Sequence, residues 1–161
     1  MPATKEKESR VLLGDREAHE HWMNVAWEHS QIGGDPQVAL AAAREARKAG
    51  APPAAVNFRM GMLLFGLGEL PEACEAFSLA VSHSPEGSYL SDAAGLARAE
   101  VLARLGHADL ALAALSSIKD NAGLWMGRLL SVSMLAQELM ARGPGGVSCR
   151  LGSIPEIGLG Q

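Results

Sequence analysis

The residues with the most obvious potential for chemistry are histidines and glutamates in the first part of the chain. A His-Glu-His tripeptide occupies positions 19–21, and Glu28 and His29 follow along the same segment. Imidazole and carboxylate groups bind zinc when several of them converge on one point. The H-E-x-x-H spacing of metalloproteases is absent, because Met23 stands where the second histidine would be. We therefore expect a solvated helix face here rather than a metal site.

No other arrangement of residues predicts a reaction. The 18 glycines include no G-x-G-x-x-G motif after a strand and no phosphate-binding loop with a lysine. Cys74 lies within a helical pattern and Cys149 within a Gly-rich stretch, so the two make no disulfide framework. A reducing, cytoplasmic setting suits such cysteines best. The sequence thus predicts a protein with no catalytic residue and no cofactor.

The composition is that of a soluble, helix-rich protein with an acidic balance. Of the 161 residues, 48% are hydrophobic and only 4% are aromatic, so a core has to be built mainly from Ala, Leu, Val and Met. Alanine has the highest helix propensity and lets helices pack closely. With 14 basic against 18 acidic residues, no cationic excess favours nucleic acid. No apolar run approaches the roughly 18 residues of a membrane helix, and segment 1–10 does not begin a signal peptide.

The middle of the chain carries a pattern of small and aromatic residues that predicts two packed helices. Segment 57–85 reads NFRMGMLLFGLGELPEACEAFSLAVSHSP. Gly61 and Ala73 stand where the two helices would touch, because larger side chains there would push the helices apart. Phe77 would fill the space beside the next helix, and Pro85 ends the second helix because it lacks an N–H.

The same spacing recurs on both sides of this segment. Upstream, three small residues precede their counterparts Gly68, Ala73 and Ala80 by 34 residues; they are Gly34, Ala39 and Ala46. Downstream, Gly106 and Ala111 follow the counterparts by 38 residues, and we expect the extra residues in the connection 86–91. Asp35-Pro36 is a good helix start, with aspartate as the N-cap and proline at the first helical position.

This pattern resembles the tetratricopeptide repeat, in which antiparallel helix pairs recur every 34 residues or so. The resemblance implies an all-α fold, a right-handed superhelical stack of three helix pairs at about 16–50, 53–86 and 91–119 within a domain spanning 15–142. A closing C-terminal helix is predicted over 121–142, because an open stack leaves its last face unpaired. This helix could instead be half of an incomplete fourth repeat. Segment 1–14 and the Gly-rich tail 143–161 are expected to be flexible.

The first helix of each predicted pair carries a second apolar stripe beyond its packing face. In tetratricopeptide proteins these first helices line a concave groove, so the resemblance implies a peptide-binding groove on this side of the stack. The residues it assigns to the groove are Met23, Trp27, Phe58, Met62, Phe65, Leu96, Glu100 and Arg104. Large aromatics and adaptable methionines suit the capture of an apolar helix or extended peptide.

The resemblance therefore favours a non-enzymatic adaptor or chaperone that binds an apolar segment of another protein. In groove character the chain is similar to small bacterial secretion chaperones built from this repeat. Members of the family that clamp terminal carboxylates are a poor comparison, because Met23 and Trp27 occupy the clamp positions. The alternatives are that the same residues are covered by the chain's own segments, or that the groove or the closing helix assembles a homo-oligomeric scaffold.

Overall fold

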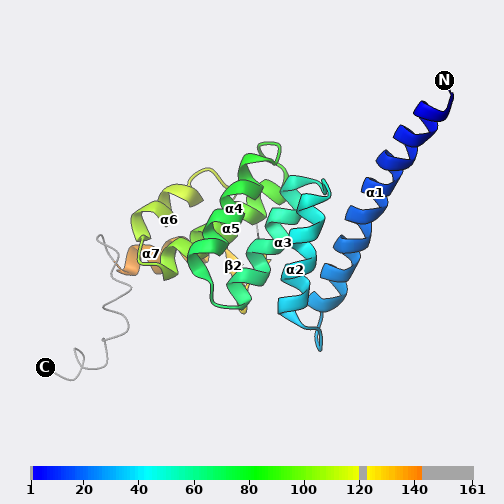
Figure 1. Ribbon diagram of the computed structural model, residues 1–161. Coiled ribbons are helices and arrows are strands. Elements are labelled where there is room, and N and C mark those ends of the chain that lie inside the picture. The colour runs from blue at the N-terminus through cyan, green and yellow to red at the C-terminus, as the bar shows by residue number, and fades with distance from the viewer. Residues whose placement is uncertain (1, 120–122, 143–161) are drawn as a thin grey trace, which may run out of the picture.

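The chain is mostly helical, as the sequence predicts. The computed structural model describes the backbone of residues 2–119 and 123–142, and side chains from residue 16 onward in these ranges. In chain order the elements are α1 (Pro2–Ser30), α2 (Pro36–Lys48), α3 (Pro53–Gly66), α4 (Leu70–Ser82), α5 (Tyr89–Arg104), α6 (Ala108–Leu115), β1 (Gly123–Trp125), β2 (Leu129–Ser131) and α7 (Val132–Arg142). Figure 1 shows the helices stacked side by side from α1 to α6.

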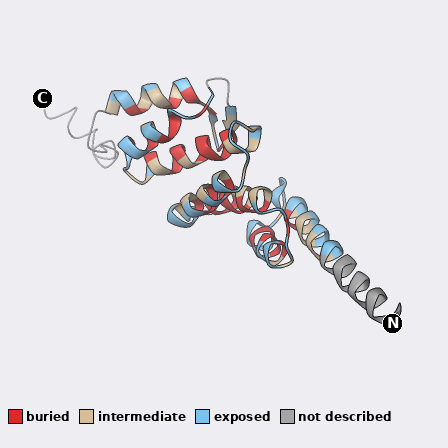
Figure 2. Cartoon of the chain, turned by 90° about the horizontal axis from the view of Figure 1, so that it is seen from above, coloured by how far each residue is buried: buried red, intermediate tan, exposed pale blue. Residues whose placement is uncertain are grey.

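Each helix from α1 to α6 packs against its neighbours in the chain, and α7 packs against α6. The buried residues, red in Figure 2, lie on the faces that the helices turn toward one another. Many of these residues are alanines that are fully buried, as at Ala39, Ala43, Ala73 and Ala97. A core of small side chains brings helix axes close together, which explains how a chain with so few aromatics buries its helices.

The turns after α3 and α5 have the same structure, which explains the glycine that the two turns share; in the turn after α1 it is Gly33, with a φ of 86°, and not the predicted Gly34 that has this conformation. Gly68 and Gly106 have φ angles of 82° and 90°, a left-handed conformation that favours glycine. In both turns the next N–H reaches back into the helix, since His107 N donates to the Leu102 carbonyl at 2.9 Å and Glu69 N makes the equivalent bond. The additional residues between Gly68 and Gly106 lie partly in a longer connection after α4, residues 83–88, and partly in a longer α5.

The start of α2 is capped as predicted. The Asp35 carboxylate accepts a hydrogen bond from Gln37 N at 2.9 Å, and Pro36 takes the first helical position. These contacts satisfy amide groups that have no partner within the helix.

Residues 2–14, within the segment predicted to be flexible, belong to α1, which begins at Pro2. Their composition accounts for the helix. Ala, Lys, Glu, Arg and Leu dominate positions 3–13, and each has a high intrinsic helix propensity. The tail 143–161, also predicted to be flexible, lies outside the described residues.

The predicted closing helix over 121–142 is wrong in its first half. Gly123–Trp125 and Leu129–Ser131 form an antiparallel hairpin, and helix begins only at Val132. We call residues 123–131 the C-terminal hairpin. Gly127, in the loop, has a φ of 75°, which a helix cannot accommodate. The Ser131 hydroxyl accepts a hydrogen bond from Met134 N at 3.2 Å, so Ser131 caps the last helix.

The contact between Gly61 and Phe77 yields a first prediction. A Cβ at Gly61 would lie 2.6 Å from the Phe77 ring, and this ring is fully buried and has little room to move. We expect Gly61→Ala to lower the free energy of unfolding by about 1–3 kcal/mol, measured by urea denaturation. Gly66→Ala in the same helix is the control: its Cβ meets open space, so the variant should gain up to about 1 kcal/mol. Equal effects of the two substitutions would contradict this account of the α3–α4 contact.

Candidate peptide-binding groove

Three of the predicted groove residues meet in a cavity of about 390 Å³ between α1 and α3. We call it the α1–α3 pocket. Its walls are Trp27, Ser30, Gln31, Phe58, Arg59, Met62 and Leu63. The Trp27 side chain comes from the last turns of α1, and the Phe58 and Met62 side chains lie one turn apart on α3. The i, i+4 spacing that marked the stripe on α3 therefore does place both side chains at one cavity.

The walls of the pocket are held by contacts across the two helices. The Arg59 guanidinium lies 4.8 Å from the centroid of the Trp27 ring, and its Nη1 atom donates to the Ser30 hydroxyl at 3.3 Å. A cation over an indole face is a favourable electrostatic contact. Phe58 packs against Phe77 with the ring centroids 5.8 Å apart. With these contacts in place, the Trp27 indole remains 55% exposed at the opening of the cavity.

The sequence reasoning missed Arg59, which dominates the electrostatics of the pocket. Burial lowers the pKa of its guanidinium below the usual range of arginine. Among the described residues, its Nε atom is buried without a hydrogen-bond partner. Arg59 directly follows Phe58 in the sequence, but a stripe that is defined by its apolar residues does not include a charged residue beside it. Only the position of α1 shows that this cation enters the pocket.

Phe65 and Arg104 are also brought together, farther along the stack. The Arg104 guanidinium lies 4.8 Å from the centroid of the Phe65 ring, so it covers one face of an aromatic that was predicted to be open. Met23, in contrast, is half-buried against the core and is not part of the pocket wall. The open apolar surface is therefore smaller than predicted and is centred on Trp27, Phe58 and Met62.

Leu96 and Glu100 do not line an open groove, which corrects the prediction for the third repeat. Leu96 is 0% exposed and Glu100 is 1% exposed. The physical reason is the C-terminal hairpin, which packs on α5. Arg128 of this hairpin reaches Glu100 through two hydrogen bonds, from Nε to Oε2 at 3.1 Å and from Nη2 to Oε1 at 3.3 Å. Part of the surface expected to bind a partner is thus covered by the chain itself.

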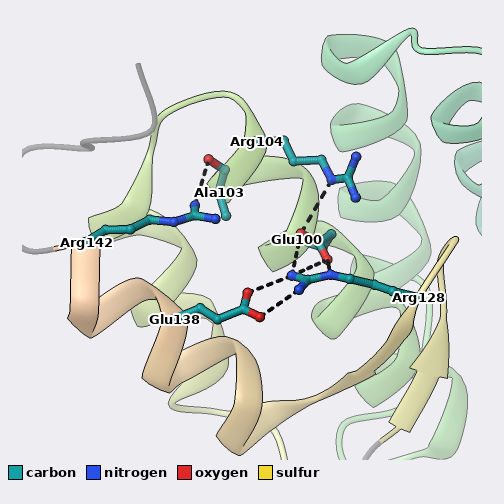
Figure 3. Close-up of polar contacts among 6 residues, drawn as sticks. All are labelled: Glu100, Ala103, Arg104, Arg128, Glu138 and Arg142. Carbon is teal, nitrogen blue, oxygen red and sulfur yellow. Dashed lines mark hydrogen bonds and ion pairs between the residues drawn. The ribbon is translucent and has the colours of Figure 1, made fainter. Parts of the chain in front are cut away.

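A second carboxylate completes the cluster around Arg128 (Figure 3). Glu138 on α7 receives Arg128 Nη1 and Nη2 at 2.6 and 2.7 Å, a bidentate pair. The hydrogen bonds that Arg128 donates to Glu138 are the main reason that the pKa of Arg128 is raised, and the same bonds lower the pKa of Glu138. Arg104 adds a longer contact to Glu100 at 3.5 Å. We infer a structural role, because this cluster ties the C-terminal hairpin to α5 and α7.

The residues considered for chemistry do not come together in the described part of the chain. No group of three or more His, Cys, Asp or Glu side chains there is placed to hold a metal ion. The Cys74 thiol is half-buried, and burial raises its pKa, which lowers its reactivity. None of the described helices has the length and apolar character needed to cross a membrane.

Comparisons with protein-family models, with curated proteins and with solved structures found no match to this chain.

The buried Glu100 yields a second prediction. Arg128→Met leaves this carboxylate with only the long contact to Arg104, so we expect a loss of about 3 kcal/mol in the free energy of unfolding, near the lower end for a broken buried pair. Arg16→Met is the matched control, because it removes an exposed pair with Glu20 and should cost less than about 1 kcal/mol. Adding Glu100→Gln to Arg128→Met should restore part of the loss; no recovery would contradict the role given to the buried charge.

Glu138 yields a prediction of pH dependence. Its pKa is lowered in the folded protein, so its ionised form stabilises the fold above the usual carboxyl pKa of about 4.3, and this contribution disappears as the pH falls through the lower folded value. Wild type should therefore be more stable than Glu138→Gln at pH 7, and the difference should close at acidic pH. Chemical denaturation across this range measures it. Glu20→Gln, at an exposed pair, should show a small difference throughout; a Glu138 difference that is independent of pH would contradict the assignment.

Proposed function

We propose that this protein is a non-enzymatic protein-binding module, an adaptor or chaperone that holds an apolar helix or extended peptide of a partner. The observation that carries the proposal is the α1–α3 pocket. An indole that is 55% exposed stands there beside Phe58 and Met62, at a cavity of about 390 Å³. Cavities of roughly 300–1,000 Å³ with apolar walls and a few polar groups are typical binding sites.

The residue types in the pocket support a protein segment as the ligand. Tryptophan and arginine are the residues most often found to dominate the energy of protein interfaces, and here Trp27 and Arg59 are in contact. Met62 adds an adaptable apolar surface. The cavity suits one large side chain of a partner, with the rest of the segment lying across the exposed edges of α1 and α3.

The proposed architecture behind this pocket is a tetratricopeptide-like stack. Support comes from helices that pack in chain order, from the matching turns at Gly68 and Gly106, and from Gly61 facing the Phe77 ring. In such a stack α1 and α3 would be first helices of adjacent repeats, which is where the family binds its peptides. The C-terminal hairpin over α5 would close the groove at its far end.

A homo-oligomer remains the second candidate, and a specific feature of the C-terminal hairpin favours it. Trp125 and Leu129 are directly paired across the two strands and are 65% and 67% exposed. Met140 on α7 is 62% exposed. Neighbouring large apolar side chains on a surface are typical of interaction sites. In this reading, copies of the chain would associate through the C-terminal elements.

Two tryptophans with similar exposure allow a matched test of these candidates. We expect Trp27→Ala to weaken binding of the partner by about tenfold or more, because it removes an interface anchor. Trp125→Ala should bind normally, since it lies outside the α1–α3 pocket. The partner would be isolated by affinity co-purification from the native cell with wild type and both variants, and its affinity measured with purified proteins.

The mass of each protein in solution, from analytical ultracentrifugation, separates the second candidate. A wild-type oligomer that Trp125→Ala dissociates would favour the scaffold. A partner that both variants bind as tightly as wild type does would contradict the function proposed for the pocket.

A further inference from the structure

The charge of Arg59 has no counter-charge in the part of the chain that the structure describes. Its guanidinium contacts the Trp27 ring and the Ser30 hydroxyl, both of which are neutral, and its buried Nε has no acceptor. Arg128 and Arg104, in comparison, each face a glutamate. Arg59 therefore carries a positive charge into an apolar pocket that does not neutralise it.

Such an arrangement is costly for the free protein and favourable for an acidic ligand. A half-buried guanidinium loses hydration, and an unpaired buried donor loses a hydrogen bond it would make in water. A carboxylate is the ligand that best offsets the lost hydration, because it can accept hydrogen bonds from the Nη atoms of the guanidinium and neutralise the charge. A segment bound over the pocket would exclude water from its apolar walls, which strengthens the interaction between the two charges.

We infer that the partner segment presents an Asp or Glu side chain next to a large apolar side chain. The apolar side chain fills the cavity against Trp27, Phe58 and Met62, and the carboxylate pairs with Arg59. This inference rests on the proposed function, and it specifies the chemistry that this binding site recognises.

A side-chain carboxylate fits the pocket better than a chain terminus. Terminal carboxylates are captured by sets of free backbone N–H groups, or by several polar and basic side chains together. The walls of the α1–α3 pocket come from the interior of α3 and the C-terminal end of α1, where N–H groups donate within the helix. One guanidinium, already donating through Nη1, is then the main charged donor available.

A library of random dodecapeptides, displayed on phage with no free C-terminus, tests this inference. It would be selected against the full-length protein and three variants: Trp27→Ala, Arg59→Gln and Arg44→Gln. Arg44 lies outside the pocket, so the last variant controls for the loss of one positive charge. Wild type and Arg44→Gln should enrich peptides with a large apolar residue next to Asp or Glu. Arg59→Gln should retain the apolar preference and lose the acidic one.

Synthetic peptides from the selection give the quantitative result. Replacing the acidic residue with its amide should weaken binding to wild type by about tenfold or more, as expected for a hydrogen bond to a charged group. The same replacement should have little effect on binding to Arg59→Gln. The peptide change alone tests the idea on wild-type protein, whatever the stability of the protein variants.

The possible failures can be told apart. Apolar peptides without an acidic preference, lost in Trp27→Ala, would leave the proposed function in place and overturn the recognition of a carboxylate. An acidic preference that persists in Arg59→Gln would overturn it as well. If wild type enriches no peptide over Trp27→Ala, the binding function of the pocket fails, and the inference fails with it.

Discussion

A glycine packed against a phenylalanine ring fixes the distance between α3 and α4, and the other helices of the stack pack on either side of this pair. Because Gly61 has no Cβ, the Phe77 ring can lie where a side chain would otherwise stand. The same ring supports Phe58, which forms a wall of the α1–α3 pocket. A packing constraint inside one helix pair is thereby transmitted to the surface proposed to bind a partner. Densely packed interiors transmit small displacements, so the packing of the core also restricts movement of the pocket wall.

At the far end of the stack, a buried charge adds to the apolar packing of residues such as Met126, Leu130 and Leu135. Glu100 is 1% exposed, and burying a carboxylate is unfavourable unless it is paired. Arg128 pairs with it and with Glu138, so the hairpin, α5 and α7 are fixed relative to one another by one guanidinium. The directional, bidentate geometry of arginine specifies how the hairpin sits, which apolar contacts alone would do less strictly.

The sequence predicted well the features that depend on neighbouring residues. Helix caps such as Asp35 and the turn glycines at 68 and 106 follow from local sterics and hydrogen bonding. The i, i+4 stripe on α3 identified Phe58 and Met62, which do line the cavity. These successes share a cause, because the information lies within one or two helical turns.

The errors arose where distant segments meet. Residues 123–131 were predicted as part of a closing helix because an open stack leaves its last face unpaired, and the short apolar runs in this segment do not distinguish helix from strand. Leu96 and Glu100 were assigned to an open groove because the residues near them in the sequence do not indicate a contact with Arg128. Arg128 comes 28 positions after Glu100. Arg59 was missed for the same reason, since its role depends on where α1 lies.

Arg59 also explains how an exposed tryptophan can be held ready for binding. A free indole on a surface samples several rotamers. Immobilising a side chain of many rotamers on binding costs about 0.5–1.5 kcal/mol of conformational free energy. The guanidinium over the Trp27 ring and its bond to Ser30 restrict the indole before any ligand arrives. The same cation that orients the anchor is left without a counter-charge among the described residues. In the proposed complex, pre-organisation and selectivity for an acidic segment would both come from this single side chain, so that the charge of Arg59 would be part of the binding surface.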